Sequence, residues 1–557
     1  CGACTVTISR YEQGTVVHRG VNACLAPLCS VDACHVMTVE GIGNQGNPHP
    51  VQDRISSCHG SQCGYCTPGI VMALYSKLQS NPTPSVEDIE ETFDGNLCRC
   101  TGYRPILDAA KTFAVQPELS CPVPTDVVPN NEQGHVKTDV VSTTVSKLQQ
   151  TAATNGDASL LPPPPTLPIE CQTLATDALR VEGGGVTWHR PSTLEMLLSL
   201  KEEFPNAKMI TGNTEVGIET RFKNFEYPNF IHTIGVAELC TLASDSNGTV
   251  HVGGAVTLAQ LEHFCVELLQ SSSVDSTAAP ASSLRNVQAM LDMLRWFASS
   301  QIRNVASLAG NLCTASPISD MNPVLLAAGA TVDLQSKKGN VRTVHMSKFF
   351  LGYRKTALKP DEIVVCIHVP GTKQHEFVRA YKQAKRRDDD ISIVNGCLRC
   401  EVDPTTTQIR TFSTGFGGMA ATTVSSPSAE SQMLSLQLSE REVTLDVLTK
   451  ALTTDMMLSP KVPGGMAAYR TTLVLSFAHK FLAHVCQEMK LTVDPRDASL
   501  PQTFLSAPRP ITTGVQMYQY DPMGGGLQHA NQTVPHTELT NDSTNSVLGN
   551  PKERGPV

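Results

Sequence analysis

The spacing of apolar residues predicts a pair of helices near the start of the chain. Residues 68–82, PGIVMALYSKLQSNP, are apolar at helical intervals, with Pro68 in the first turn and Asn-Pro at the end. Residues 85–96, SVEDIEETFDGN, predict a second helix that Ser85 caps and Gly95 closes. An antiparallel arrangement would place the start of the first helix beside the end of the second.

Further along the chain, the pattern predicts helices at 192–204, with Ser192 as the cap, and at 286–302. It predicts strands at 249–258 and 362–370, where β-branched and other apolar residues are concentrated. Mixed strands and helices are typical of a multidomain α+β fold.

Two stretches lack this patterning. Residues 116–181 hold four consecutive prolines, 162–165, among Ser, Thr, Asn, Gln and Asp, and we predict an extended, mobile linker. The chain turns polar again after Asp494 and ends in a similar tail. We therefore expect six parts, with these boundaries: 1–45, 46–115, 116–181, 182–370, 371–492 and 493–557.

Composition excludes some classes of protein. The 557 residues include 43 Lys and Arg against 52 Asp and Glu, so the formal net charge of -9 offers no basic surface to a nucleic acid. No run of about 18 apolar residues occurs, so no membrane span is predicted. The chain starts with Cys1 and not with Met, and we expect that the sequence is incomplete there.

The cysteines carry the first chemical signal. Cys63 and Cys66 (CGYC) precede the first predicted helix, and Cys98 and Cys100 (CRC) follow the second, so packing of the helices would gather four sulfurs. An iron–sulfur cluster is one explanation of this set. A structural zinc ion is another, although zinc sites usually pair two C-x₂-C motifs. Disulfides are the third, and the reduced, intracellular compartment that we assume disfavours them.

A second set of cysteines begins the chain. Cys1 and Cys4 have the C-x₂-C spacing of the second and third ligands in plant-type [2Fe–2S] ferredoxins, and Cys24 would be the fourth. The first ligand would lie five residues before Cys1. The small residues Gly2 and Ala3 would let backbone N–H groups approach the sulfurs. Two such sets in one chain favour electron transfer over structural zinc.

Two loops rich in small polar residues carry the second signal. Residues 208–219 place Gly212, Asn213 and Thr214 directly after a short apolar run, where backbone N–H groups and a threonine hydroxyl would bind a pyrophosphate. Residues 306–323 form another loop rich in Gly, Ser, Thr and Asn. Neither loop has the Rossmann spacing, and each by itself is more often a plain turn.

The chain resembles the xanthine dehydrogenase/aldehyde oxidase family of molybdenum hydroxylases over nearly all of its length outside the linkers. The segments that carry the resemblance are CGACTVTISRY, NACLAPLCSV, TVEGIGN, NPHPVQDRISSCHGSQCGYCTPGIVMALY and GNLCRCTGYRPILDA, with FGGM and PGGMAAYRTTL further on. The resemblance implies a partial β-grasp ferredoxin domain, a helical [2Fe–2S] domain, and a vanillyl-alcohol-oxidase-type FAD domain with a small α/β C-terminal subdomain.

The resemblance also implies roles for the cysteines. Two [2Fe–2S] clusters are expected, and the second would lie nearer to the molybdenum centre. Gln62 resembles the glutamine that contacts the molybdopterin in the family, with an ordinary solvated amide as the alternative. The implied ligands are Cys1, Cys4 and Cys24 for the first cluster and Cys63, Cys66, Cys98 and Cys100 for the second.

For FAD, the resemblance implies a site built from both small-residue loops and from positions beyond them. Phe297 has the alternative of a core aromatic, and Asp320 and Lys382 have the alternative of solvated surface charges. The implied FAD residues are Met209, Ile210, Thr211, Gly212, Asn213, Thr214, Glu215, Phe297, Ser307, Asn311, Thr314, Asp320, Val364 and Lys382.

An NAD site is implied by GYRKT (352–356) and KQAKRRDDDIS (382–392), which resemble the dehydrogenases more than the aldehyde oxidases. Positive side chains are needed for the phosphates of a dinucleotide. The acidic run 388–390 would shape the field over the flavin. A solvated charged run is the alternative. The candidate NAD residues are Tyr353, Lys355, Arg386 and Arg387.

The function implied is the electron-transfer portion of an enzyme of purine catabolism that oxidises hypoxanthine and xanthine to urate, with NAD⁺ as acceptor. The molybdopterin and the catalytic residues would lie in a domain beyond this chain. The family also implies a homodimer in the cytoplasm or the peroxisome, with no membrane or nucleic-acid partner. Two alternatives remain: an aldehyde oxidase that reduces O₂, and a non-enzymatic interaction protein stabilised by zinc.

Overall fold

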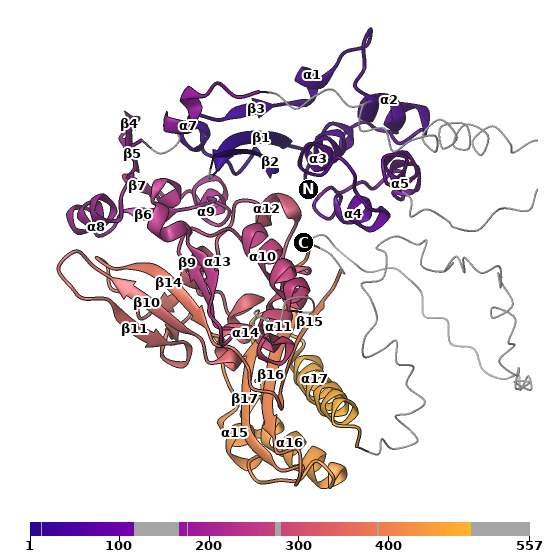
Figure 1. Cartoon of the computed structure of the whole chain (residues 1–557), viewed down its shortest axis with the longest axis vertical. Helices are drawn as coiled ribbons and strands as arrows, with labels where there is room; N and C mark the ends of the chain where they lie inside the picture. The colour runs from indigo at the N-terminus through magenta and orange to yellow at the C-terminus, as the bar shows by residue number, and fades with distance from the viewer. Residues whose placement is uncertain (13, 116–165, 175–176, 273–279, 387–388, 492–557) are drawn as a thin grey trace, which may run out of the picture. The chain divides into compact units, whose positions relative to one another are not determined.

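A small antiparallel sheet forms the first part of the computed structural model, which describes residues 1–12, 14–115, 166–174, 177–272, 280–386 and 389–491 (Figure 1). The strand order is β2-β1-β3. Side chains of β1 alternate between buried and half-buried, as expected for a strand with one covered face. The strands are β1 (Thr5–Glu12), β2 (Thr15–Asn22) and β3 (His35–Met37), with η1 (Leu28–Val31) between β2 and β3.

Helices cover this sheet and form a core of their own. The predicted helix at 68–82 is confirmed as α3, which packs against β1 and β2. The second predicted helix begins as expected, with Asp88 N donating to Ser85 Oγ (3.1 Å), but it ends at Glu91, before Gly95. The helices are α1 (Val39–Ile42), α2 (Pro50–Ser57), α3 (Thr67–Ser80), α4 (Val86–Glu91) and α5 (Arg104–Lys111).

The predicted linker at 116–181 lies partly outside the described residues, and the predicted tail at 493–557 lies wholly outside them. The last residues of the predicted linker are not extended throughout, as the prediction had them. They contain the short helix α7 (Glu170–Leu174) and the start of β4 (Leu179–Gly183). Tyr11 Oη on β1 donates to Leu167 O (3.1 Å), so this segment is fixed against the first sheet.

A four-stranded sheet, ordered β4-β5-β7-β6, begins the middle part. Strand β7 pairs in parallel with β5 and β6, and the connections run through helices. The helix predicted at 192–204 is present, but Thr193 caps it in place of Ser192, because Met196 N donates to Thr193 Oγ1 (3.2 Å). The elements are β5 (Val186–Arg190), α8 (Leu194–Glu203), β6 (Lys208–Ile210), α9 (Val216–Phe222) and β7 (Asn229–His232).

A five-stranded antiparallel sheet, ordered β11-β10-β14-β9-β8, follows. Its inner face packs on a core that includes Val252, Val332 and Ile367. The strand predicted at 362–370 is confirmed, and the one predicted at 249–258 is shorter. The strands are β8 (Leu242–Ser244), β9 (Val250–Gly253), β10 (Thr331–Gln335), β11 (Arg342–His345) and β14 (Ile363–Val369), with the small hairpin β12 (Phe350–Gly352) and β13 (Lys355–Thr356).

The helix predicted at 286–302 is wrong as a single element. It is divided between α11 and α12, because the backbone turns at Ala298, whose φ of 45° lies in the left-handed region. Short 3₁₀ turns occur at Thr233–Gly235, Ala237–Cys240, Ala281–Ser283 and Met346–Lys348. The helices of this part are α10 (Leu258–Ser271), α11 (Arg285–Leu294), α12 (Ser300–Arg303), α13 (Leu308–Thr314) and α14 (Met321–Ala328).

The last part is a three-stranded antiparallel sheet, β15-β16-β17, with helices gathered around it (Figure 1). Helix α14 contacts β16 and β17, and the long α17 packs on β16. Phe412, Phe416 and Phe481 are buried between the sheet and its helices. The elements are β15 (Glu376–Ala384), β16 (Ser392–Val402), β17 (Ile409–Gly417), α15 (Pro427–Gln432), α16 (Arg441–Asp455) and α17 (Ala467–Glu488).

Across the residues that the structure describes, no helix is both long enough and apolar enough to cross a lipid bilayer.

A buried histidine of α17 predicts acid sensitivity of this last part. Burial and the charges of Arg379 and Arg285 lower the pKa of His484 to about 3, and Arg379 Nε donates to its Nε2 (3.0 Å). The unfolded chain takes up this proton below pH 6.5, so folding stability falls as the pH drops from 6.5 towards 3, by about 1.4 kcal/mol at pH 5.5.

We therefore expect that His484→Gln, which keeps an acceptor for Arg379, will flatten the loss of stability on acidification. The measurement is the shift in thermal unfolding temperature between pH 7.5 and 5.5 for the wild type and the variant. His263→Gln, at an exposed position on α10, is the control. Equal shifts in the wild type and His484→Gln would contradict the assignment.

Candidate functional site

The four cysteines of the helical part come together as two thiol pairs. Cys66 is the cap residue of α3, and Cys98 and Cys100 lie in the turn between α4 and α5. A hydrogen bond joins Cys63 to Cys100, and another joins Cys66 to Cys98. The prediction that the two helices bring both cysteine motifs together is thus confirmed.

The turn that holds Cys98 is fixed by its own polar groups. Cys98 N donates to Tyr103 Oη (2.9 Å), and this hydroxyl donates in turn to Asn96 O (2.9 Å). Burial, together with Cys98 nearby, raises the pKa of Cys66 to about 12. Burial acts in the same direction on Cys98 and is the largest single effect. Hydrogen bonds from Thr101, whose Oγ1 lies 3.0 Å from the sulfur, and from Cys66 and Cys100 together outweigh it, so the pKa of Cys98 is lowered.

This donor set fits a binuclear cluster. In the described part of the chain, no three His, Cys, Asp or Glu side chains are grouped as a single metal ion requires. A structural zinc ion takes four thiolates at one point, whereas each iron of a [2Fe–2S] cluster takes two protein ligands. Two thiol pairs match the second arrangement. The described cysteines are free thiols, so disulfides do not explain the set.

The first set of cysteines is assembled by the register of the first sheet. Thr5 pairs with Asn22, so Cys4 and Cys24 lie just beyond the last pair of β1 and β2 and are hydrogen-bonded to each other. Burial, and then Cys4, raise the pKa of Cys24. The amino group of Cys1 lies close enough to oppose this effect. The structure therefore brings Cys4 and Cys24 together with the start of the chain, and the ligand set Cys1, Cys4 and Cys24 stays a prediction.

The two cysteine sets and the middle part meet at a tightly packed junction. A Cβ on Gly69 of α3 would lie 2.1 Å from Gly2 O, and one on Gly95 would lie 2.4 Å from Ser299 Cβ, so only glycine fits at either position. The buried Asn96 donates to Gly2 O (3.1 Å) and accepts from Gln301 Nε2 (2.6 Å). One side chain thus joins three segments that are distant in sequence.

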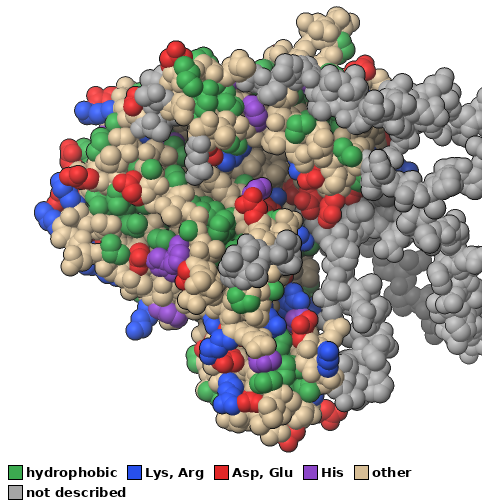
Figure 2. Space-filling view, viewed as in Figure 1, with side chains coloured by type: hydrophobic (Ala, Val, Ile, Leu, Met, Phe, Trp, Pro, Cys, Tyr) green, Lys and Arg blue, Asp and Glu red, His purple; other side chains and the backbone are tan. Residues whose placement is uncertain are grey.

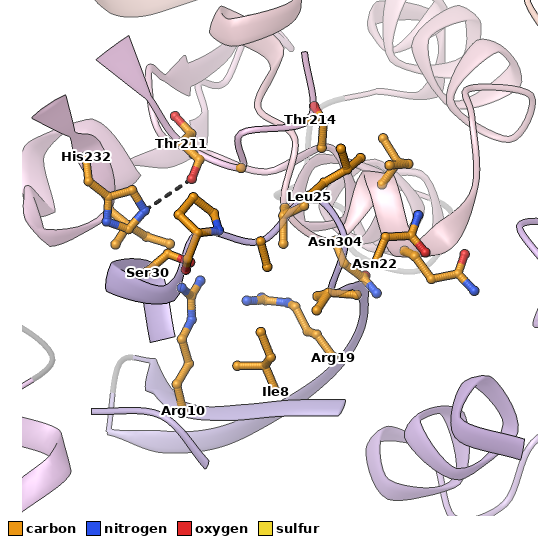
Figure 3. Close-up of a pocket in the computed structure, with 18 of the residues that line it drawn as sticks. Ile8, Arg10, Arg19, Asn22, Leu25, Ser30, Thr211, Thr214, His232 and Asn304 are labelled. Carbon is orange, nitrogen blue, oxygen red and sulfur yellow. Dashed lines mark hydrogen bonds between the residues drawn. The ribbon is translucent and has the colours of Figure 1, made fainter. Parts of the chain in front are cut away.

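A cavity lies between the first sheet and the loop after β6 (Figure 3). Arg10 and Arg19 extend into it from β1 and β2 and share the carboxylate of Glu12, so the three groups carry a net positive charge. Thr211 and His232 line the opposite side, with His232 Nε2 3.2 Å from Thr211 O. Burial, and then the charge of Arg10, lower the pKa of His232 to about 3, so this imidazole is neutral.

The two loops that the sequence proposed for FAD lie side by side. Ser307 Oγ donates to Thr211 Oγ1 (3.3 Å). A Cβ on Gly212 would lie 2.1 Å from Val305 O, so packing between the loops explains this glycine. Asn213 has a φ of 58° and donates from Nδ2 to Leu25 O (2.9 Å), which fixes the loop against the first sheet.

The second of these loops is largely helical, which differs from the prediction. Ser307 caps α13, with Gly310 N donating to its hydroxyl (3.0 Å), and α14 begins at Met321. Asn311 Oδ1 accepts from Ser319 Oγ (2.6 Å) in the turn between the helices. A helix start presents free backbone N–H groups, which suit phosphate oxygens.

Asp320 and Lys382 form a buried ion pair, so the surface-charge alternative is wrong. Lys382 Nζ donates to Asp320 Oδ2 (2.6 Å) and to Trp296 O (2.7 Å). Ser392 Oγ and Asn395 Nδ2 both donate to Asp320 Oδ1, at 2.5 and 2.9 Å. The pair links α14 to β15 and β16, beside the second FAD loop.

The remaining FAD candidates are distributed around these loops. Phe297 is half-buried against the core, after the end of α11, which is compatible with both of its alternatives. Glu215 accepts a hydrogen bond from Arg354 Nη1 (2.7 Å). Sequence analysis did not single out Arg354 as a site residue. The others are Met209 and Ile210 on β6, Thr214 beside the cavity, Thr314 at the end of α13, and Val364 on β14.

The NAD candidates contact different neighbours. Tyr353 and Lys355 are exposed on the β12–β13 hairpin, beside the Arg354–Glu215 ion pair. Arg386 Nη2 instead donates to Asp389 O (2.7 Å), and its charge acts on Tyr103 of the helical part. Arg387 lies outside the described residues, and Gln62 is exposed next to Cys63.

Three family models match successive parts of the chain. Residues 38–111 match a [2Fe-2S] binding domain, residues 182–372 match the FAD binding domain in molybdopterin dehydrogenase, and residues 379–485 match the CO dehydrogenase flavoprotein C-terminal domain. Together with the thiol pairs and the adjoining loops, these matches define an iron–sulfur flavoprotein.

The relatives identify the family. A xanthine dehydrogenase of Oryza sativa subsp. japonica is 40% identical over 568 residues, which cover 96% of this chain and 40% of the relative. A xanthine dehydrogenase/oxidase of Rattus norvegicus is 42% identical over 511 residues, 91% of this chain and 37% of the relative. The chain belongs to the xanthine dehydrogenase family of molybdenum hydroxylases.

The chain spans about 40% of the length of these relatives. Among solved structures, a Cu,Mo-CO dehydrogenase aligns with 54% of this chain and 98% of its own, at 18% identity and a TM-score of 0.46.

The junction gives a test of how the cysteine sets are positioned. We expect that Gly69→Ala will destabilise the protein by about 1–3 kcal/mol, because the methyl group overpacks the contact between α3 and the loop at Gly2. Alanine has the higher helix propensity, so local helix stability alone predicts the opposite sign. Denaturant unfolding and iron content per chain measure the effect.

Gly183→Ala is the matched control, because nothing lies within 4 Å of a Cβ built there. A Gly69→Ala variant as stable as this control, with unchanged iron content, would rule out the proposed close packing.

Proposed function

We propose that this chain is the electron-transfer portion of a xanthine dehydrogenase, in which hypoxanthine and xanthine are oxidised to urate in purine catabolism and NAD⁺ is the acceptor. The names of the relatives and the family models for iron–sulfur and FAD domains support this proposal. The molybdopterin and the purine would be bound by a domain that these residues do not include, and the complete enzyme would be a homodimer in the cytoplasm or the peroxisome.

The observation that carries the proposal is the junction at Asn96. This residue stands two positions before Cys98, bonds to the loop between Cys1 and Cys4, and accepts from Gln301 of the flavin part. Both cysteine sets and the flavin part therefore share one buried contact. Such an arrangement suits a relay between redox groups and has no evident use in a protein held together by separate zinc ions.

The side chains of this portion would hold the groups and tune them. The clusters and FAD, when bound, supply one-electron and two-electron chemistry. Cys63, Cys66, Cys98 and Cys100 would provide the second cluster with thiolates. Thr101 Oγ1, 3.0 Å from Cys98 Sγ, would donate a hydrogen bond to a ligand sulfur, which raises a reduction potential.

The buried Lys382–Asp320 pair would shape the flavin site. Its position beside α13 places a fixed positive group near the second FAD loop, while the hydrogen bonds from Ser392 and Asn395 hold the carboxylate in place. A buried charge pair with satisfied hydrogen bonds is rigid, so it would keep the geometry of the pocket during electron transfer.

Metal analysis and EPR test the cluster assignment. We expect anaerobically purified protein to contain iron and sulfide and to give a [2Fe–2S] EPR signal after reduction. Cys98→Ser should lose about two irons per chain. Cys58→Ser, at a buried cysteine outside both sets, should lose none. Zinc without iron in the purified protein would instead support the interaction-protein alternative.

The NAD assignment has a separate test that needs only the flavin of this chain. Reduction of ferricyanide by NADH should show a KM for NADH that rises at least about ten-fold in Lys355→Met, because the phosphates lose a positive partner. FAD content should stay unchanged. Lys348→Met, at another exposed lysine a few residues earlier, is the control. An unaltered KM would leave O₂, and so the aldehyde-oxidase alternative, as the better explanation.

A further inference from the structure

A strained turn between α11 and α12 is held by two buried cations. Ala298 has a φ of 45°, in the left-handed region that alanine rarely adopts, so other contacts must keep the backbone there. Three consecutive carbonyl oxygens of this turn accept hydrogen bonds from cationic side chains. Lys382 Nζ donates to Trp296 O (2.7 Å). Arg303 Nη1 donates to Phe297 O (3.1 Å) and to Ala298 O (3.3 Å).

Arg303 uses the other sides of its guanidinium to reach two carboxylates. Its Nε donates to Glu262 Oε2 on α10 (3.0 Å), and its Nη2 lies 3.7 Å from Asp94 Oδ2 in the helical part. The side chains of Arg303 and Asp94 are 7% and 2% exposed, whereas charges of both signs are spread over the visible surface in Figure 2. The planar fork thus serves acceptors on several sides, whereas a lysine ammonium presents its donors at one point.

These contacts join the turn to the parts that carry the cysteine sets. Asp94 stands in the segment that leads from α4 to Cys98. Just after α12, Asn304 Nδ2 donates to Gly20 O on β2 (2.8 Å). Arg303, the last residue of α12, therefore lies where a displacement of either cysteine-bearing part would be passed to the turn after α11.

We propose that Arg303 is a positioning residue for the flavin, which holds the turn at Phe297 in a geometry that depends on Asp94 of the helical part. The inference rests on the proposed function, because Phe297 and Lys382 are candidate FAD residues. FAD would find its complete site only when the helical part is packed in place. An electron relay gains from this dependence, since the separation and orientation of reacting groups strongly affect their rate.

A role in stability alone predicts a different result. Substitution of Arg303 removes a partner of Asp94 and Glu262, so the thermal unfolding temperature should fall in either case. If stability were the whole effect, the protein that remains folded would bind FAD as before. A positioning role changes the FAD affinity of the folded protein. Lysine, which keeps the charge and loses the planar fork, would not restore that affinity.

FAD titration tests the positioning role. FAD is removed from the purified protein and titrated back while flavin fluorescence is followed, and samples of equal iron content are compared. In Arg303→Lys, the Kd for FAD should rise at least about ten-fold, because small displacements of positioning groups have large effects. Arg104→Lys is the matched control, since Arg104 also lies 3.7 Å from an aspartate, Asp108, but is 73% exposed. The control should bind FAD as the wild type does.

Asp94→Asn tests whether the effect crosses from the helical part. This substitution keeps the size of the side chain and alters no candidate FAD residue, and it should raise the Kd for FAD at least about three-fold. Combined with Arg303→Lys, its effect on the binding free energy should be less than additive, because both residues act through one contact. Asp108→Asn, in the matching exposed ion pair, is the control.

The outcomes separate this inference from the proposed function. A wild type that takes up no FAD would overturn both. A wild type that binds FAD, with the same Kd in Arg303→Lys and in Asp94→Asn, would overturn the positioning role alone. If Arg303→Lys does not yield folded protein, the Kd of Asp94→Asn decides by itself.

Discussion

The close approach of three backbone segments, at Gly2, Gly69 and Gly95, is the constraint on which the arrangement of the candidate redox sites depends. A side chain at any of these positions would meet backbone or Cβ atoms at less than 3 Å. Asn96 uses the space that glycine leaves free and bonds across it, to Gly2 O and to Gln301. The hydrogen bonds of a buried amide are strong only while donor and acceptor keep their distance and angle. The close packing of the three segments preserves that geometry, and the hydrogen bonds hold the segments together in turn.

In the flavin part, a buried ion pair joins distant segments in the way that the buried amide of Asn96 does at the junction. Asp320 and Lys382 are buried, and burial of two charges is unfavourable unless their remaining hydrogen bonds are satisfied. Trp296 O, Ser392 and Asn395 supply those bonds. The pair therefore ties α14, β15 and β16 into one geometry. The ion pair favours this one arrangement of the three elements more than it raises overall stability, because a well-packed apolar pair of similar volume would often be as stable.

Sequence reasoning succeeded where ligands are close together in the chain. The C-x₂-C and C-x-C motifs flank predictable helices, so the gathering of Cys63 and Cys66 with Cys98 and Cys100 followed from helix signals alone. Sequence reasoning failed where tertiary contacts decide whether a segment is helix or loop. The break at Ala298 has no proline or glycine to signal it. Residues 306–323 were expected to be a loop, because the capping of α13 by Ser307 was not recognised among many small residues.

The contact between His251 and His368 shows why some side-chain clusters stay hidden in a sequence. His251 and His368 are separated by 117 residues, and only the pairing of β9 with β14 brings them together. A shift of that register by one residue would turn His251 to the opposite face, into the apolar core. The second cysteine set depends on short motifs beside helices, whereas the first set already depends on the pairing of β1 with β2. A cluster made by strand register forms only if the sheet is correctly paired, so the contacts between these side chains depend on that pairing.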